Sequence, residues 1–543
     1  MSADHRWPVG AIVYQIYPRS FYDSNADGIG DLAGITAKIE YLKDLGVNAI
    51  WLSPFYLSPM KDFGYDVADY CDVDPIFGTL TDFDVMLKKA HKHGIKIIVD
   101  LVPNHTSDEH TWFEQSRQSR EGKYANWYIW HDPKGHDRDG DPIPPNNWLN
   151  IFSGTSAWEW EPARQQFYLH TFHVGQPDLN WSNPEVREAI KDVMRFWLDR
   201  GVDGFRVDAV PFMAKDPELR NDPKNSHYQR GQNPYTSLHH TNSMGWPAVH
   251  AYLNEMASVL KEPKYTHSER FMVTEGYPHT DDAIAEYLGY YEGMDPEVAA
   301  PFNFEGLGLP WEAEPWRKFL AKFHTELDAF SPLCVPSYAF GNHDQWRLVT
   351  RRGEDAARAA AVLLLTLPGM SFIYNGDELG MKNGVIPPDY VQDPGAAGGD
   401  GRDPERTPMQ WGPGKNADFT TAETTWLPVT DDYQTHNVET ESKDPDSFLT
   451  LYRKLGKLRN KSNALRYGQF KVFRTGNADV LGFSRVHDDE TYFVLINFSK
   501  KPVELQLDIH LGKPVLSSNP NSKLKTNNSQ LELNSNEAAI FRA

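Results

Sequence analysis

The sequence predicts an α/β fold, a (β/α)8 TIM barrel, with a subdomain inserted after the third strand and a C-terminal antiparallel β-domain. Three observations predict it. A helix–glycine–strand rhythm repeats along the chain, which is typical of parallel α/β folds. Polar clusters follow several of the strands, as they do at the catalytic face of a barrel. Near the C-terminus the pattern changes to two-residue alternation, which indicates antiparallel strands.

The rhythm occurs in four segments, at 35–54, 83–105, 186–210 and 356–378. In each segment a glycine stands where a helix needs a left-handed C-terminal cap, as at Gly46, Gly94 and Gly201. The strand that follows is short and apolar on both faces, which is typical of a buried parallel strand. Further strand candidates lie in 11–20, 271–278 and 336–345.

Two stretches depart from this rhythm. Residues 105–176 are rich in Trp, Pro and Gly and show no βα pattern, so they are predicted to form an inserted lid subdomain. From residue 468 onward alternating strands are separated by turn residues, which predicts a C-terminal β-sandwich domain at 468–543. The barrel would then consist of residues 1–104 and 177–467.

Composition limits the partners and the compartment. The net charge of -21 argues against nucleic acid and against an anionic membrane surface. The N-terminal segment has no apolar core of a signal peptide, and no apolar run is long enough to span a bilayer. Two cysteines, Cys71 and Cys334, cannot form a disulfide framework and fit a reducing compartment. A cytoplasmic enzyme with no membrane partner is the expectation.

The polar clusters carry carboxylates suited to sugar chemistry. Arg206 and Asp208 are two residues apart on a strand and therefore point to the same side. A guanidinium beside Asp208 should lower its pKa and keep it ionised as a nucleophile. Glu275 follows the next strand in an apolar context that should raise its pKa and make it a proton donor. With Asp344 as a third carboxylate, the set meets the needs of retaining glycoside hydrolysis.

Several motifs resemble known ones. The segments "DLVPNH" (100–105), "GFRVDAV" (204–210), "FMVTEG" (271–276) and "FGNHD" (340–344) resemble the four signature regions of the α-amylase family of glycoside hydrolases. "QPDLNW" (176–181) and "RTPMQW" (406–411) are similar to segments of its α-glucosidase and oligo-1,6-glucosidase branch. The resemblance extends over essentially the whole chain.

The resemblance implies a role for each matching residue. Asp208 would be the nucleophile, Glu275 the acid/base, and Asp344 the carboxylate that stabilises the transition state. An ion pair of Asp62 with Arg402, or with Arg406 in its place, would close the pocket and make the enzyme exo-acting. The other implied substrate-binding residues are Tyr65, His105, Phe172, Gln176, Arg206, Ala209 and His343.

The residues after the nucleophile bear on specificity. Endo-amylases of the family carry Lys-His where this chain has Pro211 and Phe212, so an endo-amylase is not expected. Ala209 directly after the nucleophile accompanies α-1,4 preference in the branch. The resemblance therefore implies an exo-α-glucosidase that acts on small α-glucosides such as maltose or sucrose and transfers glucose to sugar or alcohol acceptors. An oligo-1,6-glucosidase, a sucrose-isomerising enzyme and a catalytically silent transporter subunit stay open as alternatives.

The loop "DSNADGIGD" (23–31) predicts a structural Ca²⁺ or Mg²⁺ site. Asp23, Asn25, Asp27 and Asp31 supply oxygens in the spacing of the first part of an EF-hand loop, with a backbone carbonyl at Ile29. The distal glutamate of a true EF-hand is absent. The resemblance implies no organic cofactor.

Overall fold

The computed structural model describes residues 6–278, 282–395, 401–524 and 530–543, and its central sheet contains eight parallel strands. The strands lie in the order β13-β12-β11-β5-β2-β1-β15-β14, so neighbours in sequence are mostly neighbours in the sheet. Their bounds are β1 (Ile12–Ile16), β2 (Ala49–Leu52), β5 (Lys96–Leu101), β11 (Gly204–Val207), β12 (Phe271–Thr274), β13 (Ala299–Pro301), β14 (Ser337–Ala339) and β15 (Met370–Tyr374).

The two edges of this sheet meet beside Asn303. The Asn303 N–H donates to the Ser337 carbonyl at 2.9 Å, and Asn303 forms a parallel bridge with Tyr338. The sheet is therefore a nearly closed barrel whose strands are buried on both faces, and the predicted fold class is confirmed.

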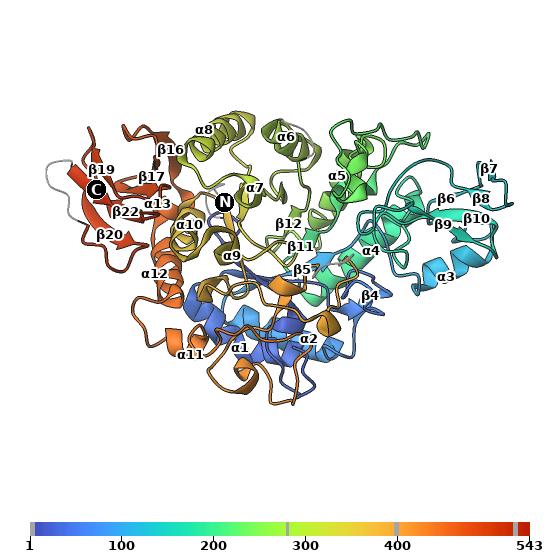
Figure 1. Cartoon of the computed structure of the whole chain (residues 1–543), viewed down its shortest axis with the longest axis horizontal. Coiled ribbons are helices and arrows are strands. Elements are labelled where there is room, and N and C mark those ends of the chain that lie inside the picture. The colour runs from blue at the N-terminus through green and yellow to red at the C-terminus, as the bar shows by residue number, and fades with distance from the viewer. Residues whose placement is uncertain (1–5, 279–281, 396–400, 525–529) are drawn as a thin grey trace.

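Helices surround the barrel (Figure 1). The larger ones are α1 (Leu32–Leu45), α2 (Leu80–Lys92), α4 (Pro184–Arg200), α5 (Ala248–Leu260), α6 (Ala283–Gly293), α8 (Ala313–Phe330), α10 (Glu354–Thr366) and α12 (Phe448–Lys461). Shorter elements around the barrel are α7 (Glu305–Gly308), α9 (Leu348–Arg352), α11 (Val438–Glu441), β3 (Tyr56–Leu57) and β4 (Asp69–Val73).

The predicted glycine caps are correct for three helices. Gly46 follows α1 and Gly201 follows α4, each at a φ near 100°, and Gly94 follows the C-cap residue of α2 at a φ of 71°; residues with a side chain avoid this region. Helix α10 instead has its C-cap at Leu367. In α10 the reason is Pro368, which disfavours helical geometry in the residue before it.

Residues 111–169 form a small unit beside the barrel, at the right of Figure 1. It contains α3 (Thr111–Gln118), a three-stranded sheet of β6 (Trp130–His131), β10 (Gln166–Leu169) and β9 (Trp158–Glu161), and the hairpin of β7 (Gly135–His136) and β8 (Pro142–Ile143). Trp148, Trp158 and Phe167 pack in a separate apolar cluster. That cluster gives the unit a core of its own.

The C-terminal region is an antiparallel β-domain, as predicted, at the left of Figure 1. Its larger sheet has the order β16 (Gln469–Phe473), β17 (Val480–His487), β18 (Glu490–Asn497), β22 (Ala538–Arg542) and β20 (Lys513–Ser517), and β19 (Val503–Gln506) pairs with β21 (Gln530–Leu533). The short helix α13 (Asn463–Tyr467) precedes it. The buried Arg485 donates to the carbonyl of Thr366 at 2.8 Å and so joins this domain to the barrel.

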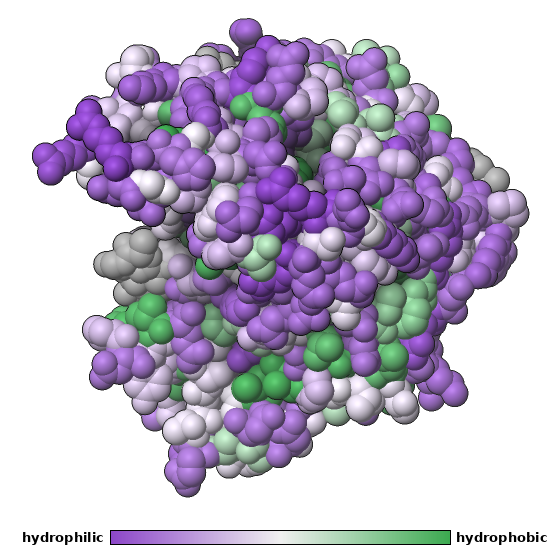
Figure 2. Space-filling model, turned by 90° about the vertical axis from the view of Figure 1, so that its right-hand side faces the viewer, coloured by the Kyte–Doolittle hydropathy of each residue, from purple (hydrophilic) through white to green (hydrophobic). Residues whose placement is uncertain are grey.

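Hydrophilic residues dominate the face of the molecule shown in Figure 2, and hydrophobic residues occupy small separate patches there. Among the described residues, no helix has both the length and the apolar character that crossing a bilayer requires.

Candidate active site

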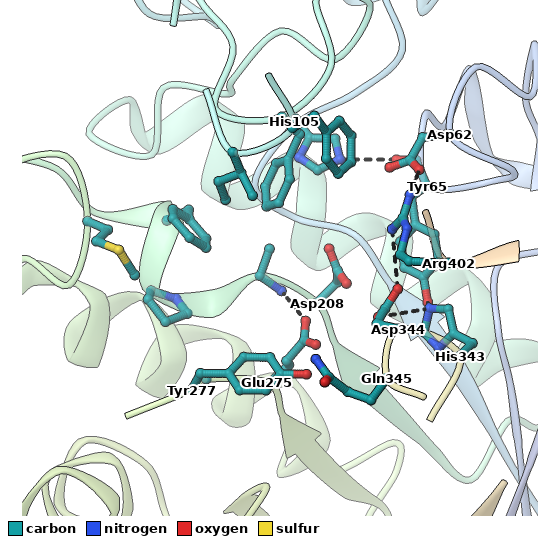
Figure 3. Close-up of a pocket in the computed structure, with 18 residues that line it drawn as sticks. Asp62, Tyr65, His105, Asp208, Glu275, Tyr277, His343, Asp344, Gln345 and Arg402 are labelled. Atoms are coloured by element: carbon teal, nitrogen blue, oxygen red, sulfur yellow. Dashed lines mark hydrogen bonds and ion pairs between the residues drawn. The ribbon is translucent and has the colours of Figure 1, made fainter. Parts of the chain in front are cut away.

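A cavity of about 310 Å³ lies at the C-terminal ends of the barrel strands (Figure 3). Loops that follow β5, β11, β12 and β14 contribute to it, and in barrels this is the face that carries catalysis. Its walls are Asp62, Tyr65, His105, Ile151, Phe152, Phe172, Asp208, Ala209, Pro211, Phe212, Met244, Glu275, Gly276, Tyr277, His343, Asp344, Gln345 and Arg402.

At the floor of the cavity one arginine contacts three carboxylates. Arg206, which is 1% exposed, lies 2.6 Å from Asp208, 2.9 Å from Asp100 and 2.8 Å from Glu275. The parallel register of β5, β11 and β12 places Arg206 directly opposite Asp100 and brings the ends of the three strands together. The floor therefore holds more negative than positive charge.

This imbalance affects the acidity of Asp208. Burial raises the pKa of Asp208, as do the neighbouring Glu275 and Asp100, and Arg206 opposes the rise only in part. Burial likewise raises the pKa of Asp100 to about 6. Arg206 thus lowers the pKa of Asp208 as expected, but the expectation of a net lowered pKa is wrong, because the arginine is shared and the site is screened from water.

The backbone turns sharply after Asp208. Ala209 has a φ of 49°, in the left-handed region, and its N–H donates to Glu275 Oε2 at 3.0 Å. The Val210 N–H donates to the Glu275 carbonyl at 3.2 Å. The loop after β11 thus fixes both the side chain and the backbone of Glu275. The side chains of Asp208 and Glu275 both contact Arg206 and therefore lie side by side.

The opposite end of the cavity is closed by an ion-pair network. Arg402 contacts Asp62 at 2.7 Å, Asp393 at 2.6 Å and Asp344 at 3.2 Å. Arg406 instead contacts Asp344 at 2.8 Å and donates to the carbonyl of His343. Of the two arginines considered from the sequence, Arg402 is the one paired with Asp62 (Figure 3).

This network holds Asp344 in its ionised form. Burial opposes the charge, but the guanidinium groups of Arg402 and Arg406 outweigh it and hold the pKa of Asp344 well below its usual range. Burial lowers the pKa of His343 and keeps its imidazole neutral. A neutral imidazole can both donate and accept hydrogen bonds, which suits contact with sugar hydroxyls.

Aromatic and histidine side chains line the space between the two charged groups. The Tyr65 ring stacks on His343 at 5.3 Å, and its hydroxyl lies 2.7 Å from His343 Nε2. His343 Nδ1 is 2.7 Å from Gln15, which fixes the ring. The Phe172 ring lies 5.1 Å from His105. These groups form the walls of a compartment suited to one sugar ring.

Two predicted substrate-binding residues do not line the cavity. Arg206 lies beneath the carboxylates, as described above. Gln176 is fully buried and donates to Asp62 Oδ2 at 3.0 Å, and the same nitrogen lies 3.1 Å from His105 Nε2. Both residues hold cavity groups in place, because their own polar atoms are used by those groups.

Sequence reasoning missed part of the lining, namely Ile151, Phe152, Met244, Tyr277 and Gln345. Tyr277 and Gln345 could have been found, since each is within two residues of a predicted catalytic carboxylate. The other three lie in loops without a recognisable motif, and only the fold brings them to the cavity.

The predicted cation loop is held by hydrogen bonds of its own. Both carboxylate oxygens of Asp23 accept backbone N–H groups, and Asp31 accepts from Ser24 and caps α1 through the Gly34 N–H. In the part of the chain that the structure describes, no group of three or more His, Cys, Asp or Glu side chains is arranged to hold a metal. The donor set nonetheless keeps an exposed carboxylate at Asp27.

Comparisons with known proteins agree with this geometry. Residues 15–468 match the family model of the α-amylase catalytic domain, and residues 470–540 match that of the maltogenic amylase C-terminal domain. The chain is 39% identical to an alpha-glucosidase of Apis mellifera, with 96% of this chain and 92% of that protein covered. It is 38% identical to an oligo-1,6-glucosidase of Parageobacillus thermoglucosidasius over 99% of each. A solved alpha-glucosyl transfer enzyme superposes with a TM-score of 0.89 at 38% identity, over 99% of both chains.

Proposed function

Because the chain belongs to the α-amylase family of glycoside hydrolases, we propose that it is a retaining exo-α-glucosidase that prefers α-1,4-linked substrates. It is a hydrolase of glucosides, as its relatives are. We further propose that the enzyme retains the anomeric configuration, releases one glucose at a time from the end of the substrate, and transfers glucose to sugar or alcohol acceptors.

The observation that carries the proposal is the common contact of Asp208 and Glu275 with Arg206, at 2.6 Å and 2.8 Å, which holds the two carboxyl groups side by side. Carboxyl groups this close leave no room for the water molecule that an inverting enzyme holds against the sugar. Retaining enzymes hold the pair about 5 Å apart and inverting ones about 6.5–9.5 Å. Asp208 would attack the anomeric carbon while protonated Glu275 donates its proton to the leaving oxygen.

The second half-reaction reverses these roles. Ionised Glu275 removes a proton from water or an acceptor alcohol, whose oxygen attacks the anomeric carbon and releases Asp208. Asp344 and the neutral His343 and His105 would hold hydroxyls of the glucose ring, with bonds that strengthen as the ring flattens. Arg206 and Gln176 would position the carboxylates and His105.

The exo mode is supported by the closed end of the cavity. The Arg402–Asp62 pair and the contact of Arg402 with Asp344 fill the space that a longer chain would need beyond the first glucose. The α-1,4 preference is supported by Ala209 alone, which lines the cavity with a small side chain. An oligo-1,6-glucosidase or a sucrose-isomerising enzyme is the alternative on the same site.

A time course with maltose, isomaltose and sucrose tests these points, with NMR detection of the anomeric form of the released glucose. We expect α-glucose first and maltose as the fastest substrate. Faster isomaltose would overturn the linkage, a rearranged disaccharide from sucrose would identify an isomerising enzyme, and initial β-glucose would overturn the retaining mechanism. If the protein turned over no α-glucoside, the alternative of a catalytically silent, transporter-associated barrel would be favoured instead.

We also propose that the loop at 23–31 holds a structural Ca²⁺ or Mg²⁺. Asn25 and Asp27 are exposed oxygen donors, and the Ile29 carbonyl would complete the set. EDTA should lower the melting temperature, and Asp27→Ala should remove that sensitivity with little loss of turnover. A melting temperature that EDTA leaves unchanged would argue against a bound ion. A cytoplasmic location and the absence of nucleic-acid and membrane partners remain predictions from composition.

A further inference from the structure

The polar groups of the cavity are distributed unevenly. Asp62, Arg402, Asp344 and His343 gather at its closed end (Figure 3). The lining also includes four large apolar side chains, Ile151, Phe152, Phe212 and Met244, which we call the aglycone wall. If the closed end holds the glucose, this wall faces the group that leaves or accepts it.

The aglycone wall is built from two loops that are fastened together. Ile151 and Phe152 come from the loop between β8 and β9, and Phe212 and Met244 from the long connection between β11 and α5. Hydrogen bonds from Asn146 to the Leu219 carbonyl, at 3.0 Å, and from Trp148 to the Arg220 carbonyl, at 2.9 Å, join these loops. The wall is therefore a fixed part of the fold.

Its rings are already arranged for contact with another ring. Phe212 meets Phe172 edge-on at 5.3 Å, and Phe152 lies 5.9 Å from Phe172. Met244 adds a polarisable sulfur, which makes favourable contacts with aromatic rings. The Arg402 guanidinium lies over the Phe152 ring, 5.1 Å from its centre, and so also holds the ring in place.

This side of the cavity offers little to a sugar. Among the lining residues that the structure describes, only Gln345 and Tyr277 add side-chain polar groups outside the closed end and the Asp208–Glu275 pair, and the Tyr277 hydroxyl already accepts from Asn342 at 3.4 Å. Hydroxyls of a second sugar placed against the wall would exchange water for apolar side chains, which is unfavourable without new hydrogen bonds. An apolar ring would gain by the same exchange.

We propose that the acceptor and aglycone site takes small primary alcohols carrying an aromatic ring in preference to sugars. This inference rests on the proposed function, because it needs a glucosyl-enzyme. The alcohol oxygen bonds to the anomeric carbon, its proton goes to Glu275, and the ester bond to Asp208 breaks. The product is an aryl-alkyl α-glucoside.

Competition between two acceptors tests the proposal. α-Glucosyl fluoride is the donor, so that no sugar leaving group occupies the site, and benzyl alcohol and glucose are present at equal concentration. We expect benzyl α-glucoside to exceed the disaccharide products. Fluoride release with disaccharide equal or in excess would overturn this inference and leave the proposed function standing. An absence of fluoride release would overturn both.

A volume-conserving variant links the preference to the wall. Met244→Gln replaces the thioether by an amide of similar size, and we expect the ratio of benzyl glucoside to disaccharide to fall about tenfold. The ratio is measured within one reaction, so a loss of folded enzyme cancels. If Met244→Gln fails to fold, the same ratio is measured for Phe212→Ser, and we expect it to fall there as well. Phe330→Ser, at an exposed residue on α8 away from the cavity, is the matched control and should keep the wild-type ratio. An unchanged ratio in the wall variants would overturn the proposal.

Discussion

A buried aspartate lies at each end of strand β11, and the side chains around these two aspartates differ in charge. Asp203 precedes the strand and Asp208 follows it. Around Asp203 the side chains of His91, Lys96 and Arg270 gather within 3.1 Å, and the Ile97 N–H donates to it. Around Asp208 a single arginine is shared with two further carboxylates, as described above.

The difference appears in the acidity of the two groups. Burial would raise the pKa of Asp203, but His91 and Lys96 outweigh it, so the pKa is lowered. At Asp208 burial prevails and the pKa is raised. A buried carboxylate surrounded by several cations stabilises the fold. A buried carboxylate that shares one cation with other carboxylates has a raised pKa, as is common at functional sites. The N-terminal end of the barrel strands therefore carries a stabilising carboxylate, and the C-terminal end carries the carboxylates proposed for the reaction.

The largest expected effect comes from Asp208→Asn. If Asp208 is the nucleophile, as proposed, its loss should lower kcat by at least about 10⁴-fold, as removal of a group that forms the covalent intermediate does. The melting temperature should not fall, because the change removes a buried charge that the fold holds at a cost. Steady-state kinetics and thermal unfolding measure the two effects. Turnover within a hundredfold of wild type would refute the assignment of Asp208.

Arg206→Gln should have the next largest effect. The variant loses the group that orients three carboxylates, and kcat/KM should fall about 10²-fold. Arg206 opposes the raised pKa of Asp208, so its removal should raise that pKa further. Because Asp208 must be ionised to attack, the acid limb of the kcat/KM profile should move to higher pH. An acid limb that stays in place or moves lower would contradict this account.

Asp203→Asn should reverse the pattern seen for Asp208→Asn. It leaves the buried Arg270 without its carboxylate, and the free energy of unfolding should fall by about 3 kcal/mol. Lys96 and His91 are about one-third exposed and can turn to water, which keeps the loss at the lower end of the range for buried pairs. Per folded molecule, kcat should stay within about twofold of wild type. Urea unfolding and active-site titration give the two values.

The smallest effect is the pH dependence of that difference. The folded-state pKa of Asp203 is lowered, so its contribution is present above the unfolded value of about 3.9 and is lost as the pH falls through the folded value. The gap in unfolding free energy between wild type and Asp203→Asn should be constant from pH 7 to about 5 and shrink below it. A gap that grows on acidification would show that Asp203 is not a stabilising carboxylate.

Part of the site could be predicted because it lies in short motifs next to strands. Asp208, Glu275 and Asp344 each follow a strand that the apolar pattern reveals, so their convergence follows from the barrel alone. The motif at 176–181 predicts that Gln176 binds substrate, yet the Gln176 side chain lies behind Asp62 and His105. A motif identifies the neighbourhood of a residue, but packing decides whether its side chain reaches the cavity.

The sequence by itself determined the barrel, the C-terminal β-domain and the carboxylate triad, because apolar periodicity and residues adjacent to strands are local properties. Tertiary structure alone decided which arginine pairs with Asp62, which direction the pKa of Asp208 takes, and which loops form the aglycone wall. These depend on distances between segments that are far apart in the sequence, such as those of Asp62 and Arg402. Electrostatic and apolar contacts act through space, so they are fixed only when the chain has folded.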